Sequence, residues 1–441
     1  MLSILFVTLF LLTLLFFFLL VKLSAIDLLK PSITSIFFLG YLLFSYIGLL
    51  SLFFGMDDYR ILIGINNPYK VLRLWFYCSL SLYLVIIGFI FSNKVLGMRD
   101  INKSSFEIQT LGFSTKGSIF LLFGVSLIVF IVYLSKLPAI PIVEFLKGSS
   151  EANLQVLRSL ATNDFSGDYH WYTLFFSTIL TLLTYLTFAE LLINKNLKNQ
   201  LIFWMVFLIA SFAAIVPTHK APFIWLIFGL LFTYLITKRK RVSLIQLISL
   251  GFLIIVILFF MFKYFMGLEN RTNAEIFSMI FNRTTSGQLT PAYFYIDIFP
   301  NEIGYLLGSS FPNPGGIFPW DPFNLKAFVA NYINSGLTGQ GIVGSAPTVF
   351  WGEMYANFGF FAVVISSFVV GILLYSIQYF VSRLSNNSIT IALNTWLIIE
   401  FHKLALTGLS SFIINIDIIA VVLIVGFLLL QQNSRKRGAS V

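Results

Sequence analysis

Long apolar segments, separated by short polar stretches, follow one another along this chain. A helix that spans a bilayer needs about 20 mostly apolar residues, and about eleven segments come near that length. They cover residues 2–21, 33–55, 71–92, 118–136, 171–193, 201–217, 222–237, 244–266, 357–380, 390–408 and 411–431. None alternates between apolar and polar residues as a membrane β-strand does. The pattern predicts an all-α polytopic membrane protein with about 11 transmembrane helices.

The composition indicates the same class of protein. Of the 441 residues, 58% are hydrophobic and 10% are charged, whereas a soluble domain carries roughly 25% charged residues. The net charge of +10 would suit nucleic acid in a soluble protein. In a membrane protein the same excess belongs to cytoplasmic loops, so we predict no nucleic-acid partner. Segment 2–21 has no basic residue before it and no A-x-A cleavage site after it, so we expect a retained helix.

Basic residues predict the orientation, because cytoplasmic loops of membrane proteins carry an excess of Lys and Arg. The clearest groups are the Lys-Arg-Lys-Arg run at 238–241 and the Arg-Lys-Arg tail at 435–437. Other loops contribute further basic residues, namely Lys94, Arg99, Lys103, Lys116, Lys195, Lys198 and Arg383. With eleven spans these groups all lie in the cytoplasm, and the N-terminus lies outside.

Two long loops then face outward, at residues 137–170 and 267–350. The second is rich in Gly, Pro and aromatic residues. Proline fixes φ and removes a backbone donor, so we expect ordered turns with few long helices here. We therefore divide the chain into three parts: helices one to eight (1–266), a large periplasmic loop (267–356), and helices nine to eleven with a cytoplasmic tail (357–441).

Ionisable residues near the predicted outer face are candidates for chemistry, because a charge inside a span is costly. Glu400, His402 and Lys403 lie within one turn of the tenth segment. They form either a charge network, with Asp417 as a further member, or a water-accessible cationic site.

Other cations stand on predicted outer loops. His219 and Lys220 lie between two prolines in the turn at 217–222. This lysine either snorkels to lipid headgroups or presents a rigidly held cation to a lipid pyrophosphate. Arg271 and Arg283 are either solvated or grip phosphate with their planar fork.

Glu353, at the predicted outer boundary of the ninth segment, is the candidate base. Partial desolvation would raise its pKa and suit it to general-base chemistry, although a salt bridge would explain it equally well. Cys78 is the single cysteine, and the chain has three histidines and no phosphate-loop or H-E-x-x-H motif. Asp57-Asp58 is a weak metal signal, so we predict metal-independent chemistry without a cofactor.

Several short motifs of the second half resemble the Wzy-type O-antigen or oligosaccharide repeat-unit polymerases. They are residues 282–295, 298–300 (Ile-Phe-Pro), 307–310 (Leu-Gly-Ser-Ser), 344–348 (Gly-Ser-Ala-Pro-Thr) and 352–359 (Gly-Glu-Met-Tyr-Ala-Asn-Phe-Gly). The Thr-His-Lys turn at 218–220 is similar to a short Gly/Ser-Lys/Arg element of that family. Lys220 and Arg283 match its cationic positions, whereas His219 departs from the small residue often found there.

The resemblance implies a fold similar to glycosyltransferase class C and transfer of a growing glycan from undecaprenyl pyrophosphate to a lipid-linked repeat unit. The reaction would occur at the periplasmic side of a bacterial inner membrane, with membrane lipid and a chain-length regulator protein as further partners. Lys220, Arg271, Arg283 and Lys403 would bind the pyrophosphate. Glu353, or alternatively His402, would accept the proton. The residues expected at the sugars are His219, Tyr293, Tyr355, Glu400 and His402.

Three alternatives stay open. An O-antigen ligase uses the same donor with another acceptor. A lipid-linked oligosaccharide flippase or other transporter predicts charges along a midplane pathway. A scaffold of a polysaccharide assembly complex needs no buried ionisable cluster. The charges gather near the predicted outer face instead, which favours an enzyme.

Overall fold

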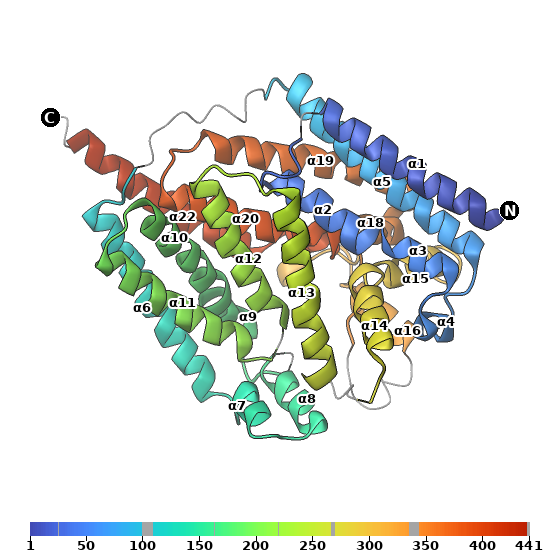
Figure 1. Cartoon of the computed structure of the whole chain (residues 1–441), viewed down its shortest axis with the longest axis horizontal. Helices are drawn as coiled ribbons and strands as arrows, with labels where there is room; N and C mark the ends of the chain where they lie inside the picture. The colour runs from blue at the N-terminus through green and yellow to red at the C-terminus, as the bar shows by residue number, and fades with distance from the viewer. Residues whose placement is uncertain are drawn as a thin grey trace. The chain divides into compact units, whose positions relative to one another are not determined.

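The computed structural model describes residues 1–24, 26–98, 109–162, 164–218, 220–265, 270–334 and 344–438. Within these ranges the chain consists of helices and two isolated β-bridges, with no strand (Figure 1). The predicted all-α polytopic membrane fold is therefore confirmed. Arg99, Lys103 and His219 lie outside the described residues.

In the described part of the chain, nine helical segments are long and apolar enough to span a membrane. They are Leu2–Leu23, Ile33–Phe54, Pro68–Lys94, Ser114–Ser135, Tyr169–Ile193, Leu197–Ile215, Ile245–Lys263, Phe360–Arg383 and Ser410–Ser434. Each matches a predicted span.

The other two predicted spans form shorter helices. The apolar part of α12 (Lys220–Thr237) is Ala221–Thr237. Helix α20 (Ser388–His402) has 15 residues, because the chain tightens into a 3-10 turn at Lys403–Ala405.

The helices form two compact units, each with its own contacts. Unit 1 comprises Met1–Ile101, Val242–Phe380 and Glu400–Ile414; unit 2 comprises Asn102–Arg241, Val381–Ile399 and Asn415–Val441.

Unit 1 contains long membrane helices and most of the short ones. Its helices are α1 (Leu2–Leu23), α2 (Ile33–Ser45), α3 (Gly48–Phe54), α4 (Asp58–Leu62), α5 (Pro68–Lys94), α13 (Leu244–Phe265), α14 (Asn273–Thr285), α15 (Leu289–Ile298), α16 (Leu325–Ile333), α18 (Phe350–Phe358) and α19 (Phe360–Arg383). Helices α5 and α19 cross at Gly88 and Gly371. A Cβ at Gly88 would lie 2.2 Å from the Phe368 carbonyl oxygen, so small residues permit the close approach.

The segment predicted as a large outer loop folds into short helices within unit 1. Helices α14, α15 and α16 have 13, 10 and 9 residues. This agrees with the expectation of few long helices. Helix α15 is buried from Leu289 to Ile296, so the segment contributes to the core of unit 1.

Unit 2 is built around the buried helix α10 (Leu180–Ile193), which packs on α6 (Phe113–Ser135), α11 (Leu197–Ile215) and α12. The π-helix Leu174–Ile179 joins α9 (Tyr169–Thr173) to α10, and α22 (Ile416–Gly438) also belongs to this unit, whereas α21 (Ser410–Ile413) belongs to unit 1. In Figure 1 the short helices α7 (Pro141–Leu146) and α8 (Glu151–Leu160) lie at the end of unit 2 opposite the C-terminal end of α22.

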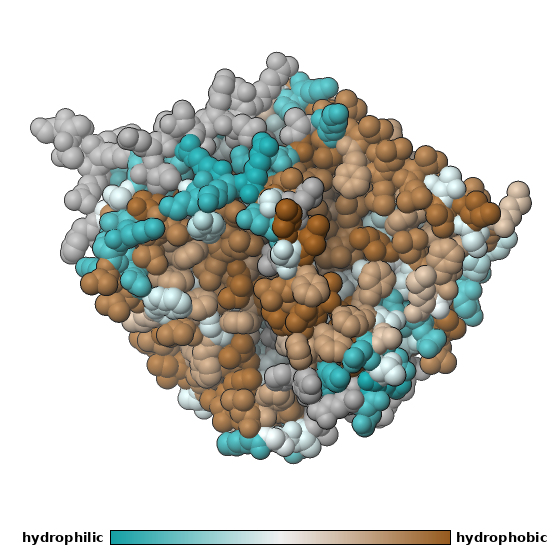
Figure 2. All heavy atoms as spheres, in the orientation of Figure 1, coloured by the Kyte–Doolittle hydropathy of each residue, from teal (hydrophilic) through white to brown (hydrophobic). Residues whose placement is uncertain are grey.

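The outer faces of α6 and α11 are apolar, as the brown surface of unit 2 in Figure 2 shows. Leu121 of α6 is 70% exposed and Leu201 of α11 is 72% exposed. Contiguous exposed apolar surface of this kind is unfavourable in water and is covered by lipid in a membrane protein.

Candidate functional site

The Glu353 carboxyl group lies at the centre of a polar cluster in unit 1. It projects from the first turns of α18 and is 4% exposed. The Ser410 backbone N–H donates to its Oε2 at 2.8 Å, and the Ser410 hydroxyl donates to its Oε1 at 2.5 Å. The Ser310 hydroxyl donates to Oε1 at 3.3 Å. Three donors from two distant turns therefore hold this side chain.

Gly408 allows the second of these turns to reach Glu353. A Cβ at Gly408 would lie 2.3 Å from Glu353 Oε2. Gly408 also pairs with Phe350 in an isolated parallel bridge, which joins the turn to the start of α18. Any larger residue at 408 would displace the carboxyl group.

Asn357 fixes the direction of the Ser310 hydroxyl. Its amide nitrogen donates to Ser310 Oγ at 2.8 Å, and its amide oxygen accepts from the Gly308 N–H at 3.0 Å. Since Ser310 Oγ already accepts from Asn357, its own proton is directed at Glu353. Ser310 is partly exposed, so it connects the buried carboxyl group to the surface.

Burial raises the pKa of Glu353, because a desolvated carboxyl group resists ionisation. The hydrogen bonds from Ser410 and Ser310 and the charge of Lys326 act in the opposite direction. Lys326, on α16, donates to the Ser411 hydroxyl at 2.9 Å. The Glu353 carboxyl group therefore binds a proton more tightly than an exposed glutamate does. The Ser310 hydroxyl, which is hydrogen-bonded to it, can pass that proton to it.

The charged residues near the end of α20 form a pair. Lys403 Nζ lies 2.6 Å from Glu400 Oε2, and Glu400 is 8% exposed. His402, between them, is buried. Asp417, the further member expected from the sequence, belongs to unit 2.

Arg271 and Arg283 are both exposed in unit 1. Arg271 lies 3.9 Å from Glu275. Arg283, in the last turn of α14, lies over the Phe262 ring at 6.0 Å. Both guanidinium groups face outward, where an anionic ligand can reach them.

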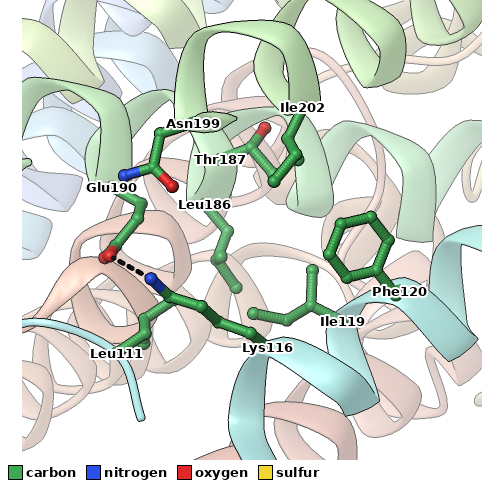
Figure 3. Close-up of a pocket in the computed structure, with 9 residues that line it drawn as sticks. All are labelled: Leu111, Lys116, Ile119, Phe120, Leu186, Thr187, Glu190, Asn199 and Ile202. Carbon is green, nitrogen blue, oxygen red and sulfur yellow. Dashed lines mark ion pairs between the residues drawn. The ribbon is translucent and has the colours of Figure 1, made fainter. Parts of the chain in front are cut away.

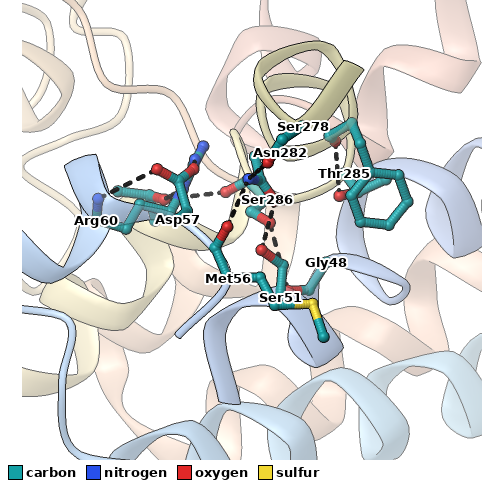
Figure 4. Close-up of polar contacts among 11 residues, drawn as sticks. Gly48, Ser51, Met56, Asp57, Arg60, Ser278, Asn282, Thr285 and Ser286 are labelled. Carbon is teal, nitrogen blue, oxygen red and sulfur yellow. Dashed lines mark hydrogen bonds and ion pairs between the residues drawn. The ribbon is translucent and has the colours of Figure 1, made fainter. Parts of the chain in front are cut away.

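The neighbour of Arg283, Asn282, points inward and joins α14 to α3 (Figure 4). Its amide oxygen accepts from the Ser51 hydroxyl at 2.5 Å, and its amide nitrogen donates to the Met56 carbonyl oxygen at 3.1 Å. A Cβ at Gly48 would lie 2.2 Å from the Thr285 carbonyl oxygen. The two residues of this motif therefore have different roles: Asn282 anchors α14 to α3, and Arg283 faces outward.

Arg60 and Asp57 form a nearly buried ion pair in the same region of unit 1 (Figure 4). Arg60 also donates through Nε to the Thr290 hydroxyl at 2.7 Å. Burial lowers the pKa of Arg60 to about 10. Asp57, a weak metal signal in the sequence, accepts a hydrogen bond from the Arg60 guanidinium in the structure.

The two predicted sugar-binding tyrosines are buried beside cations from α5. Tyr293 is 3% exposed, with Lys70 Nζ 5.9 Å from its ring centre. Tyr355 is 1% exposed, and its hydroxyl accepts from Arg73 at 2.6 Å. Each ring is therefore part of the core of unit 1.

The turn at 217–222 lies in unit 2, where Arg158 of α8 contacts it. Arg158 Nε donates to Thr218 Oγ1 at 2.5 Å. Thr218 has a φ of +56°, which is uncommon for a residue other than glycine and marks a constrained turn. Lys220 begins α12, but its side chain is not among those described. Arg158 is a cation of this turn that the sequence did not reveal.

A separate pocket in unit 2 contains a charge pair (Figure 3). Lys116 Nζ lies 3.5 Å from Glu190 Oε1, and the Ser388 hydroxyl donates to Oε2 at 2.9 Å. Glu190 is 4% exposed. Apolar side chains, among them Leu186 and Phe120, surround the pair. These contacts join α6 to α10, and the positive charge of Lys116 compensates the negative charge of the buried Glu190 carboxylate.

Among the described residues, no group of three or more His, Cys, Asp or Glu side chains could hold a metal ion. Metal-independent chemistry stays a prediction. The chain matches no family model, no curated protein and no solved structure. The resemblance to Wzy-type polymerases therefore rests on the sequence motifs alone.

Proposed function

We propose that this chain is a membrane glycosyltransferase that polymerises lipid-linked oligosaccharide repeat units. It would act at the periplasmic side of a bacterial inner membrane, with undecaprenyl pyrophosphate as the leaving group. The observation that carries the proposal is the buried Glu353, bonded to the partly exposed Ser310. Both residues lie in motifs that resemble the polymerases and in segments that the charge distribution predicts to be external.

The proposed reaction needs a base and a site for the leaving group. A hydroxyl oxygen of the acceptor sugar attacks C1 of the donor sugar. The bond between C1 and the pyrophosphate oxygen breaks, and its electron pair leaves with the diphosphate. The acceptor hydroxyl proton moves to Ser310, while Ser310 passes its own proton to Glu353. The raised pKa makes Glu353 a stronger base once it is ionised.

Cations would stabilise the charge that develops on the diphosphate. From the sequence we assign this role to Lys220, Arg271, Arg283 and Lys403; the last three lie in unit 1, as Glu353 does. A preorganised donor is typically worth about 3 kcal/mol in a dry site.

Glu353→Gln tests the base, because an amide keeps the shape of the side chain and cannot accept the proton. We expect the rate of polymerisation by the purified protein, measured as the product ladder from lipid-linked repeat units, to fall about 10²-fold or more. Ser310→Ala should also slow the reaction while leaving Glu353 bonded to Ser410. The exposed Glu302→Gln is the matched control and should retain the full rate, because Glu302 bonds to Tyr332 and to none of the assigned residues.

The pH dependence separates a base from a merely structural carboxyl group. Glu353 is active only when ionised, and burial raises its pKa. The rate should therefore rise with pH, and the acidic limb should lie above the usual range of glutamate. A Glu353→Gln variant that folds and polymerises at the normal rate would refute the assignment.

A further inference from the structure

Arg73 differs from the other cations near the start of α5. Arg60 pairs with Asp57, and Lys70 lies 2.7 Å from Asp297. Arg73 donates to the Tyr355 hydroxyl at 2.6 Å and has no carboxylate partner among the residues that the structure describes. Its charge is therefore not compensated by the protein in this region.

The surroundings of Arg73 are aromatic. Its guanidinium lies 5.7 Å from the centre of the Tyr355 ring, and Tyr305 packs edge-on against that ring at 6.2 Å. Phe76, one turn further along α5, is 46% exposed and lies near Phe360, which is 40% exposed. The guanidinium thus stands at the surface of a helix whose exposed neighbours suit lipid.

Arg73, a cation without a carboxylate partner at an apolar surface, is expected to bind an anion. A charge within or next to hydrocarbon is costly unless it is paired. Arginine meets phosphate with two parallel hydrogen bonds, and Arg73 uses one nitrogen for Tyr355. Lipid headgroups are the phosphates that a residue near the end of a membrane helix meets.

We propose that Arg73 binds the phosphate group of a membrane lipid and that the Tyr355 hydroxyl positions its guanidinium. The buried Tyr355 oxygen accepts from one nitrogen of the exposed Arg73, which leaves the other guanidinium N–H groups for the phosphate.

This lipid site gives Tyr355, which the sequence predicts at a sugar, a role away from Glu353. Tyr355 follows Glu353 by two positions on α18, and two helical steps turn a side chain by about 200°. A phosphate at Arg73 would therefore lie on the far side of α18 from the carboxyl group. The site does not depend on the proposed reaction, because lipid binding is measured without turnover.

Native mass spectrometry of the full-length protein in detergent tests the proposal, with phosphatidylglycerol added in increasing amounts. We expect Arg73→Ala to bind the lipid about tenfold more weakly than the unmodified protein. Arg73→Lys should lose less, because it keeps the charge without the fork. Lys94→Ala, at the other end of the same helix, is the matched control and should leave the affinity unchanged.

Two further measurements make the result decisive. Tyr355→Phe keeps the buried ring and should weaken lipid binding severalfold, which protects the test against a misfolded Arg73→Ala. Sodium pyrophosphate serves as the free anion and should not displace the lipid. Equal lipid binding by Arg73→Ala and the unmodified protein, or full displacement by pyrophosphate, would overturn the proposal.

Discussion

Arg158 of α8 bonds to Thr218, which precedes Lys220 by two positions in the chain. If this turn holds the leaving diphosphate, Arg158→Ala and Lys220→Ala should each remove long-chain polysaccharide from cells. Arg283→Ala should do the same. Loss of one preorganised donor typically costs about 10²-fold in rate. Gel electrophoresis of the polysaccharide measures the chain length, and immunoblotting of membranes measures the amount of protein.

Lys147→Ala is the control for these variants. Lys147 is an exposed lysine on the other predicted outer loop and pairs with Glu144. An exposed pair of this kind contributes little to stability, so chain lengths should stay normal. Normal chain lengths in the Arg158, Lys220 and Arg283 variants as well would refute the cationic assignment.

At the scale of helices, the crossing of α5 and α19 should be sensitive to a single methyl group. A Cβ at Gly371 would lie 2.1 Å from the Val85 carbonyl oxygen, so Gly371→Ala must push the helices apart. We expect about 1–3 kcal/mol of destabilisation, seen as a lower midpoint of thermal unfolding in detergent.

Gly124→Ala is the matched substitution on α6. A Cβ there meets no atom within 4 Å, and alanine favours a helix over glycine by about 1 kcal/mol. Its unfolding midpoint should stay the same or rise. A midpoint for Gly371→Ala that also stays the same would show that the two helices are not tightly packed.

Helices were also the elements that the sequence predicted best. Every predicted span coincides with a helix, because bilayer hydrocarbon and a protein core both select apolar residues. For the same reason the sequence predicted a membrane span at α20 (Ser388–His402). This helix is buried along its length and, with 15 residues, is too short to cross a bilayer by itself. Hydropathy alone could not distinguish these two environments.

The candidate site was predicted less completely than the helices. The sequence predicts Glu353 as a candidate base because a partly desolvated carboxylate at a membrane boundary has a raised pKa. Its partner Ser410 lies 57 positions away in the chain, and Arg158 lies 60 positions from Thr218. Contacts of that range depend on tertiary packing, and serine and exposed arginine are too common to be noticed alone.

For the whole molecule, the decisive question is which step of polysaccharide assembly fails in its absence. A polymerase joins repeat units, whereas a separate step attaches them to the final acceptor. Deleting the chain should therefore leave single repeat units attached to that acceptor, visible as one short band by electrophoresis. A ligase would leave no attached units, and a flippase would leave lipid-linked units on the inner face of the membrane. Either of those outcomes would refute the polymerase. Restoration of long chains by the unmodified protein and by Glu302→Gln, with single units persisting under Glu353→Gln, would connect the cellular defect to the buried carboxyl group.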